Sequence, residues 1–402
     1  MLSAPLPVVL PTGYVVDDEF SAASRRVWAS AADKVRALTT RHPDRFPLYT
    51  QGGAWAIDGE AWTHWCDGFL GGELWMLSEH APDGPWFRQR AEHYFRLIED
   101  RKTDADVHDL GFLFWSTYRR WYEESGDARH RDVLVQAGKT SASRFLERGR
   151  YLPSFRDPAS LFIDIMMNVH LVLYAASVTG DQSLARVGYE HSLTTRRYLM
   201  RGDGSASHEG MFDLATGAFL RQSTQQGYRD DGSWARGQAW ALYGFGTVYR
   251  FTGDNRFLRT AIDAADFYLN QTGDRLIPPN DWAQPDPPRK YESSAAAAAA
   301  GGFWQLAGLV QNDRLAREYA DYAIRILLRL SESDFLAEPG DDWEGILRHG
   351  SYHEALNLGV DESVMFGDYW LLDAFDTIDQ HRQQGGGSRS TETTQGKGTH
   401  NG

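Results

Sequence analysis

Apolar residues recur at three- and four-residue spacing over most of the chain between Asp18 and Ile378. This period matches one face of an α-helix, and glycines, prolines and polar runs divide the pattern into separate segments. We therefore predict an all-α fold of about twelve helices. The predicted helices cover residues 18–40, 63–79, 86–100, 109–124, 128–147, 160–179, 182–198, 233–252, 255–271, 293–310, 314–331 and 361–378.

Three turns between these segments share one form: Ser125-Gly126-Asp127, Thr179-Gly180-Asp181 and Thr252-Gly253-Asp254. The glycine can end one helix in a left-handed conformation, and the aspartate can cap the next helix. The recurrence predicts a helical hairpin repeated about six times, as in arrays of paired helices.

Alternate segments are apolar on most faces, for example 161–174 and 295–306, whereas 128–147 and 182–198 are amphipathic. A helix that is apolar all round is buried on all sides. The alternation predicts an inner ring of buried helices inside an outer ring, an (α/α)6 toroid. An open superhelix is the alternative, and its extended surface would suit a binding scaffold without catalysis.

We expect one catalytic domain over residues 1–382. Residues 383–402 are rich in glycine, serine and threonine, and this composition predicts a disordered tail.

Composition excludes several classes of protein. The formal net charge of -14 argues against a nucleic-acid partner, because no basic surface is available for phosphates. Cys66 is the single cysteine, so neither an intrachain disulfide nor a cysteine metal site can form. No apolar run approaches the roughly 20 residues of a membrane span. Residues 1–14 contain no lysine or arginine and do not resemble a secretory signal, so we expect a cytoplasmic location.

Unusual polar residues fall near the starts of the predicted inner helices. Asp109 opens one segment, and Asp164 and Arg236 lie near the starts of two others. Trp65 and Phe69 lie one turn apart near the start of a fourth. The inner helices of a toroid run parallel, so these residues should meet in one cavity at the N-terminal ends. Helix dipoles at that end favour an anionic ligand, which points to a carboxylated sugar.

Asp164 stands among apolar neighbours in the run 161–167. Burial should raise its pKa towards the range useful for acid–base chemistry. The structural alternative is a satisfied core aspartate that caps a helix or pairs with an arginine. Asp109 has a helix cap as its alternative role. Together the two residues could form the carboxylate pair of a glycosidase-like site.

A metal site is the other chemistry considered. His108, His170, His208 and Glu209 have suitable side chains, but they lack the HExxH spacing and are scattered over loops and helices. We therefore expect neither a catalytic metal nor another cofactor. Residues 225–240 are dense in hydrogen-bonding and stacking groups directly before and within a predicted inner helix.

Five stretches together resemble glycoside hydrolase family 88, the unsaturated glucuronyl hydrolases. They span most of the predicted fold in the expected order: Trp65-Cys66-Asp67-Gly68-Phe69, His108-Asp109-Leu110-Gly111-Phe112, Asp164-Ile165-Met166-Met167-Asn168, Gln226-Gly227-Tyr228 through Trp240, and Gly367-Asp368-Tyr369.

The resemblance implies removal of a terminal 4,5-unsaturated glucuronic acid by hydration of its vinyl ether. Asp164 would protonate C4 and then deprotonate the water that attacks C5. Asp109 would hold the ring hydroxyls and support the charge of Asp164. The resemblance implies the following substrate-binding residues: Trp65, Phe69, His108, His208, Gln226, Arg236, Trp240 and Tyr352.

Some alternatives stay open. An unsaturated rhamnogalacturonyl hydrolase would share the fold and the chemistry, and an inverting glucanase or a sugar epimerase could share the fold. The chain has Gln225 where the family often has histidine, and it lacks an expected proline near 352–357. These departures leave the aglycone preference undecided. The expected partner is an unsaturated uronic-acid oligosaccharide, and the chain should be a monomer or a homodimer.

Overall fold

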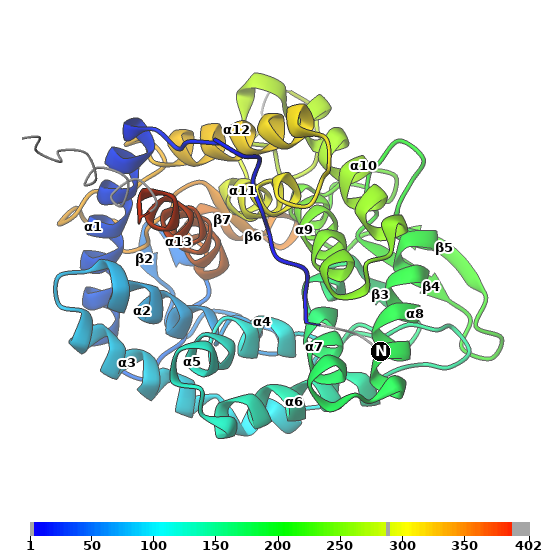
Figure 1. Ribbon diagram of the computed structural model, residues 1–402. Helices are drawn as coiled ribbons and strands as arrows, with labels where there is room; N and C mark the ends of the chain where they lie inside the picture. The colour runs from blue at the N-terminus through cyan, green and yellow to red at the C-terminus, as the bar shows by residue number, and fades with distance from the viewer. Residues whose placement is uncertain (1–3, 287–289, 388–402) are drawn as a thin grey trace, which may run out of the picture.

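The computed structural model describes residues 4–286 and 290–387. Thirteen α-helices and seven short strands form within these residues. Figure 1 shows the helices arranged as a closed ring, with one set of helices inside another. No helix of the described part has the length and apolar character needed to cross a bilayer.

Burial separates the inner helices from the outer ones. In α11 fourteen of fifteen residues are buried, whereas in α12 only eight of eighteen are. Small residues fill α11, which lets it pack closely against α9 and α13 on its two sides. The inner helices are α2 (Phe69–His80), α4 (Leu110–Trp115), α7 (Val169–Thr179), α9 (Ala235–Thr252), α11 (Ser293–Ala307) and α13 (Met365–Gly387). The outer helices are α1 (Asp18–Arg41), α3 (Gly84–Leu97), α6 (Ala128–Ser143), α8 (Gln182–Leu199), α10 (Asn255–Thr272) and α12 (Asp313–Leu330), and α5 (Tyr118–Ser125) connects α4 to α6.

The recurring turns have the predicted form. Gly126, Gly180 and Gly253 follow α5, α7 and α9 with φ of 64°, 72° and 66°, the left-handed conformation that glycine adopts without strain. In each turn the next aspartate accepts a hydrogen bond from the backbone N–H two residues later and so caps α6, α8 or α10.

The first and last helices close the ring. Phe20 of α1 stacks on Phe375 of α13 with ring centroids 5.0 Å apart. Ser24 Oγ and Trp28 Nε1 donate hydrogen bonds to Asp379 Oδ2 at 2.5 and 3.0 Å. The hairpin made from the two ends of the chain completes an (α/α)6 barrel, so the toroid is confirmed and the open superhelix is wrong.

Some predicted boundaries differ from the structure. The segment 109–124 divides at Ser116 and Thr117, whose hydroxyls donate to the carbonyls of Phe112 and Leu113 within the same turn. The helix predicted from 63 begins at Phe69. α13 continues to Gly387, so the boundary placed at 382/383 lies within this helix. Residues 388–402 of the predicted tail lie outside the described residues.

The segment 160–179 is not one helix. It contains strand β3 (Ser160–Phe162), the 3₁₀ turn η2 (Ile163–Met167) and then α7. β3 pairs antiparallel with β4 (Glu209–Phe212), which also pairs with β5 (Phe219–Ser223). The pairing partner lies almost 50 residues away, so the helical period of the segment gave no sign of it. Asp164 therefore lies in the turn that precedes α7.

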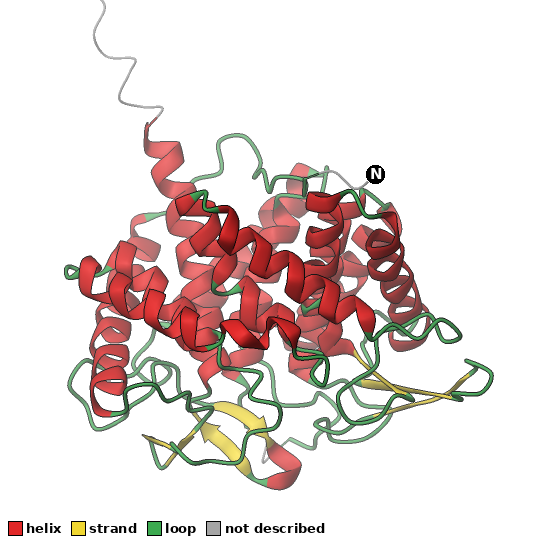
Figure 2. Ribbon diagram, turned by 90° about the horizontal axis from the view of Figure 1, so that it is seen from below, coloured by secondary structure: helices red, strands yellow, loops and turns green. Residues whose placement is uncertain are grey.

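Strands and 3₁₀ turns gather in the loops that lead into the inner helices, on one side of the helical ring (Figure 2). β6 (Gly350–His353) and β7 (Leu358–Glu362) form a hairpin around η4 (Glu354–Leu356) before α13, so the helix predicted from 361 begins at Met365. The remaining elements are β1 (Thr50–Gln51), β2 (Ala54–Trp55), η1 (Glu99–Thr103) and η3 (Gly273–Arg275).

Candidate active site

Asp109 and Asp164 lie at the N-terminal ends of neighbouring inner helices. Asp109 occupies the N-cap position of α4, but its side chain makes no capping hydrogen bond. Asn168 joins the two segments: its Oδ1 accepts the Phe112 N–H at 2.9 Å, and its Nδ2 donates to the Asp164 carbonyl at 3.1 Å. A Cβ on Gly111 would meet Asn168 Cα at 2.5 Å, so this glycine is required for the close approach.

Each aspartate has a histidine beside it, and the two pairs are built alike. His208 Nε2 lies 3.7 Å from Asp164 Oδ2, and His108 Nε2 lies 3.2 Å from Asp109 Oδ1. The Nδ1 of His108 accepts the Phe155 N–H at 3.0 Å. The Nδ1 of His208 accepts backbone N–H groups of the loop that follows β5, of which the nearest is 3.0 Å away. Because a backbone N–H can only donate, the ring proton of both neutral histidines is on Nε2 and faces the carboxylate.

Burial shifts the pKa of all four groups. It raises the pKa of Asp164 to about 7, although the positive charge of Arg236 opposes the shift. Burial and the negative charge of Asp164 raise the pKa of Asp109 well above its usual range. Burial lowers the pKa of His208 to about 3 and that of His108 well below its usual range. Near neutral pH the site therefore holds neutral histidines and a carboxyl group that can both give and take a proton.

The atoms that face each other here have unused hydrogen-bonding capacity. Asp164 Oδ2 and His208 Nε2 are buried and form no hydrogen bond within the described residues. A buried polar atom without a partner costs free energy, and sites that bind a ligand are where this cost occurs.

Arg236 organises the loops around the site. Its guanidinium donates to the carbonyls of Ser351 and Tyr352 at 2.6 and 2.9 Å and to Gln226 Oε1 at 2.7 Å. Glu292 Oε2 lies 3.5 Å from the same group. Arg236 is almost fully buried, so it fixes Gln226 and β6 in place and adds a positive charge near Asp164.

An aromatic cluster lies beside the carboxylates. Trp65 has its ring centroid 5.0 Å from Phe366, 5.3 Å from Phe112 and 5.9 Å from Phe69. Phe112 in turn lies 5.4 Å from Trp240. Phe69 and Trp240 are almost fully buried, whereas Trp65 is half-buried. Of the three predicted stacking residues, Trp65 therefore has the exposed surface.

A pocket of about 290 Å³ borders the site through Phe155 and Phe162, which contact the two histidines. Phe155 stacks on His108 with centroids 5.7 Å apart, and Phe162 lies 4.6 Å from His208. Tyr352 is buried below the rim, where its ring lies 5.2 Å from Trp62. The residues around the pocket are Glu60, Trp62, Phe155, Arg156, Phe162, Gln225, Gln226, His353 and Leu356.

Several of these residues carry no sign of a role in the sequence. Trp62 and Phe155 are ordinary apolar residues in loops, and Phe162 is the last residue of β3; only their contacts place them at the pocket. Asn168 was part of a recognised stretch, but its bridge between α4 and η2 depends on side-chain geometry.

The four residues considered for a metal do not bring their ligand atoms together within the described residues. Glu209 accepts hydrogen bonds from Ser160 Oγ at 2.6 Å, Ser223 Oγ at 2.7 Å and Gln225 Nε2 at 2.9 Å. Gln225 also accepts a hydrogen bond from Arg156. His170 of α7 packs edge-on against Trp115 of α4, with ring centroids 4.5 Å apart. These four candidate ligands therefore do not form one cluster.

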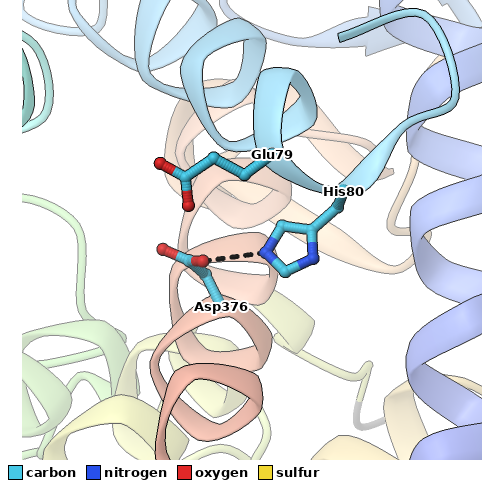
Figure 3. Close-up of side chains that lie close together, drawn as sticks. All are labelled: Glu79, His80 and Asp376. Atoms are coloured by element: carbon cyan, nitrogen blue, oxygen red, sulfur yellow. Dashed lines mark hydrogen bonds and ion pairs between the residues drawn. The ribbon is translucent and has the colours of Figure 1, made fainter. Parts of the chain in front are cut away.

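Glu79, His80 and Asp376 have ligand atoms within 4.8 Å of one another, a spacing that suits a metal ion (Figure 3). They lie at the C-terminal end of α2, the opposite end from Phe69. Asp376 already binds His80 at 2.9 Å, Arg120 at 2.8 Å and Gln380 at 3.1 Å. The arginine supplies the positive charge that a metal ion would otherwise supply, so this group is an ion-pair network.

Relatives of known activity match the chain over most of its length. It is 32% identical over 366 residues to the unsaturated glucuronyl hydrolase of Bacillus sp. strain GL1, covering 87% of this chain and 96% of the relative. It is 27% identical over 320 residues to the unsaturated chondroitin disaccharide hydrolase of Streptococcus pneumoniae, covering 78% and 81%.

The fold matches solved structures equally well. The crystal structure of the Bacillus sp. GL1 enzyme superposes with a TM-score of 0.82 at 28% identity, over 90% of this chain and 97% of that one. An unsaturated glucuronyl hydrolase specific for heparin superposes with a TM-score of 0.82 at 26% identity, over 92% and 99%. Residues 41–323 match Glycosyl Hydrolase Family 88. The (α/α)6 barrel, the pair of buried carboxyl groups and the relatives named above all agree with this match. This chain belongs to Glycosyl Hydrolase Family 88.

Proposed function

We propose that this protein removes the non-reducing terminal 4,5-unsaturated glucuronic acid from lyase-generated oligosaccharides. The observation that carries the proposal is the pair of buried carboxyl groups, each beside a neutral histidine and neither in an ion pair with an arginine of the described residues. The relatives named above act on unsaturated glucuronyl or unsaturated chondroitin substrates. We propose that the whole ring serves as one catalytic domain. The cytoplasmic location and the monomer or homodimer state stay predictions.

Asp164 is the proposed acid and base. Its carboxyl group transfers a proton to C4, and the electron pair of the C4=C5 double bond forms the new C4–H bond. Positive charge develops at C5 and is shared with the ring oxygen. A pKa of about 7 suits this step, because a large fraction of the group is protonated at neutral pH.

Hydration then completes the reaction. Water adds to C5 and gives its proton to the Asp164 carboxylate, which restores the acid. The hemiketal opens as the bond between C5 and the ring oxygen breaks. The hemiacetal left at C1 then expels the second sugar. The first step leaves the anomeric carbon untouched, so the spacing of the carboxylates does not report retention or inversion here.

The other residues position the sugar. Asp109, fixed by His108, accepts hydrogen bonds from ring hydroxyls. The His208 Nε2–H group has no hydrogen-bond partner among the residues that the structure describes and can donate to the substrate. Trp65 supplies the stacking face. Phe69 packs against it directly and Trp240 through Phe112, and Arg236 holds Gln226 and the backbone of Tyr352.

The test is a panel of unsaturated disaccharides produced by lyases from chondroitin, heparin, gellan and rhamnogalacturonan. Loss of the double-bond absorbance in the ultraviolet reports turnover. We expect turnover of at least one glucuronyl substrate and none with Asp164→Asn. If the wild-type protein turns over no unsaturated uronide, the function is wrong; if only the rhamnogalacturonan fragment reacts, the sugar class is wrong. If Asp164→Asn stays active, the proposed acid is wrong.

A further inference from the structure

A second cavity within the described residues is separate from the two aspartates. It has a volume of about 780 Å³ and lies on the outer wall of the ring, between the second half of α8 and the first half of α10. These helices are neighbours in Figure 1. Cavities of this volume hold ligands of drug size.

Arginines dominate its lining. Six of them face two carboxylates, Glu190 and Asp263, which are already paired with Arg186 and Arg259 at 3.1 and 2.9 Å. The six are Arg148, Arg150, Arg196, Arg197, Arg201 and Arg256.

Five of the six lack an acidic partner. Arg256 pairs with Asp254 at 2.7 Å, but the described residues place no carboxylate within ion-pair distance of the other five. Arg196 donates to Thr260 Oγ at 2.9 Å, and Arg201 donates to the Gly232 carbonyl at 2.9 Å. These contacts orient the side chains. The negative charges of Asp203, Asp231 and Asp281 act on Arg201 without forming an ion pair, so its charge is partly balanced.

Structural hydrogen bonds account for part of the group: Arg201 also donates to Gln222 Oε1 and Ser205 Oγ, and Arg148 donates to the Ala215 carbonyl. Arg196 and Arg197 lie in the last turn of α8, where positive charge complements the helix dipole. Arg148, Arg150 and Arg201 lie in loops outside α8 and gain nothing from that dipole. The carbonyl of Arg150 accepts a hydrogen bond from Thr194 Oγ at 2.8 Å, which fixes this loop against α8. In a chain of net charge -14, such a concentration of positive charge in one hollow implies an anionic occupant.

We propose that this cavity is a second, non-catalytic site for a small ligand that carries two or more sulfate or phosphoryl groups. Guanidinium groups bind tetrahedral oxyanions through paired N–H donors. Six arginines exceed what one carboxylate needs, so the ligand carries several oxyanion groups. A sulfated saccharide and a phosphorylated compound share this chemistry.

Arg201 links this cavity to the catalytic site. Besides the Gly232 carbonyl, its guanidinium donates to the Asp230 carbonyl at 3.1 Å. The same loop carries the backbone N–H groups of Gln225 and Gln226 that hold His208 Nδ1. An anion bound to Arg201 would therefore contact the loop that orients a catalytic-site histidine.

The test uses two probes, inorganic tripolyphosphate and a saturated, fully sulfated tetrasaccharide, measured by titration calorimetry. We expect the wild-type protein to bind at least one, more weakly at higher salt. Arg150→Ala/Arg197→Ala should weaken this binding at least about tenfold while turnover of the unsaturated substrate stays unchanged. Arg25→Ala/Arg314→Ala is the matched control, because it removes two exposed arginines without ion pairs elsewhere on the ring.

The outcomes separate the possibilities. Binding of the tetrasaccharide alone identifies a sulfated sugar, and binding of tripolyphosphate alone identifies a phosphorylated ligand. The proposal is overturned if neither probe binds, if binding survives in Arg150→Ala/Arg197→Ala, or if the control variant weakens it equally. Turnover is measured on every variant, so failure of this site is distinct from failure of the proposed hydrolase activity.

Discussion

The two ends of the ring use the same residue types in opposite ways. At the N-terminal end of the inner helices Asp164 and Asp109 lie beside His208 and His108. At the C-terminal end of α2 Asp376 lies beside His80 at 2.9 Å (Figure 3). All three aspartates are removed from most solvent, yet the pKa of Asp164 is raised to about 7 and that of Asp376 is lowered to about 2.

The difference lies in the arginine. Burial alone would raise the pKa of Asp376, but Arg120 at 2.8 Å and the hydrogen bond from His80 outweigh it. Near Asp164 the guanidinium of Arg236 is directed at carbonyl groups and Gln226 instead. An aspartate–histidine pair is therefore insufficient as a sign of catalysis; a carboxyl group becomes a proton donor where burial is not compensated by a direct cation.

The largest expected effect is on kcat, which should depend on Asp164 and not on Asp376. Asp164→Asn should lower kcat by roughly a thousandfold or more, because the amide cannot donate or take the proton. Asp376→Asn should leave kcat within about threefold, since that residue is remote from the site. Initial rates of double-bond loss measure both. Similar losses in the two variants would contradict the comparison.

The second expected effect is on the stability of the ion-pair network at the C-terminal end of α2. Arg120→Met leaves the buried carboxylates of Asp373 and Asp376 without their cation, and breaking such a pair costs about 3 to 5 kcal/mol. Urea unfolding should show this loss of unfolding free energy. The remaining folded protein should keep its kcat, and a loss of kcat at full stability would place Arg120 in the catalytic machinery.

The histidines offer a sharper test, because they are the same residue type in the two settings. His208→Ala should lower kcat about 10- to 100-fold by removing the Nε2–H that faces Asp164. His80→Ala should lower the melting temperature and leave kcat nearly unchanged. Because the pKa of His208 is about 3, its protonation should produce no step in the activity of the wild-type protein between pH 5 and about 7.

The smallest effect is in the pH dependence. The acid step needs protonated Asp164, so kcat/KM should fall about tenfold per pH unit above about 7. Folding raises the pKa of this group, so its burial costs stability as pH rises from about 4 to 7, by about 4 kcal/mol at most. Asp164→Asn should therefore be more stable than wild type at pH 8 and equal to it at pH 4.

For Asp376 the pH dependence of stability has the opposite sign. Its pKa is lowered on folding, so it adds about 2 kcal/mol of stability above pH 4, which is lost as the pH falls towards 2. Asp376→Asn should lose stability at pH 7 and not at pH 2. Thermal melts across this range check both residues, and parallel curves for the two variants would contradict the assigned shifts.

The sequence by itself determined the helical hairpins, whereas closure of the ring depends on contacts between α1 and α13. The helical period, the left-handed glycines at 126, 180 and 253 and the aspartates that follow them are local features, and local features set helices, caps and hairpins. It also indicated which aspartates to examine, since a carboxylate among apolar neighbours is costly wherever the chain places it.

Only the tertiary structure decided how those aspartates behave. The strand β3 and the turn that carries Asp164 depend on pairing with β4, and the proton position on His208 depends on backbone N–H groups of the loop after β5. Asp376 is paired with an arginine 256 residues away in the chain. A pKa is set by burial and by charges in space, and neither quantity can be read from the order of residues.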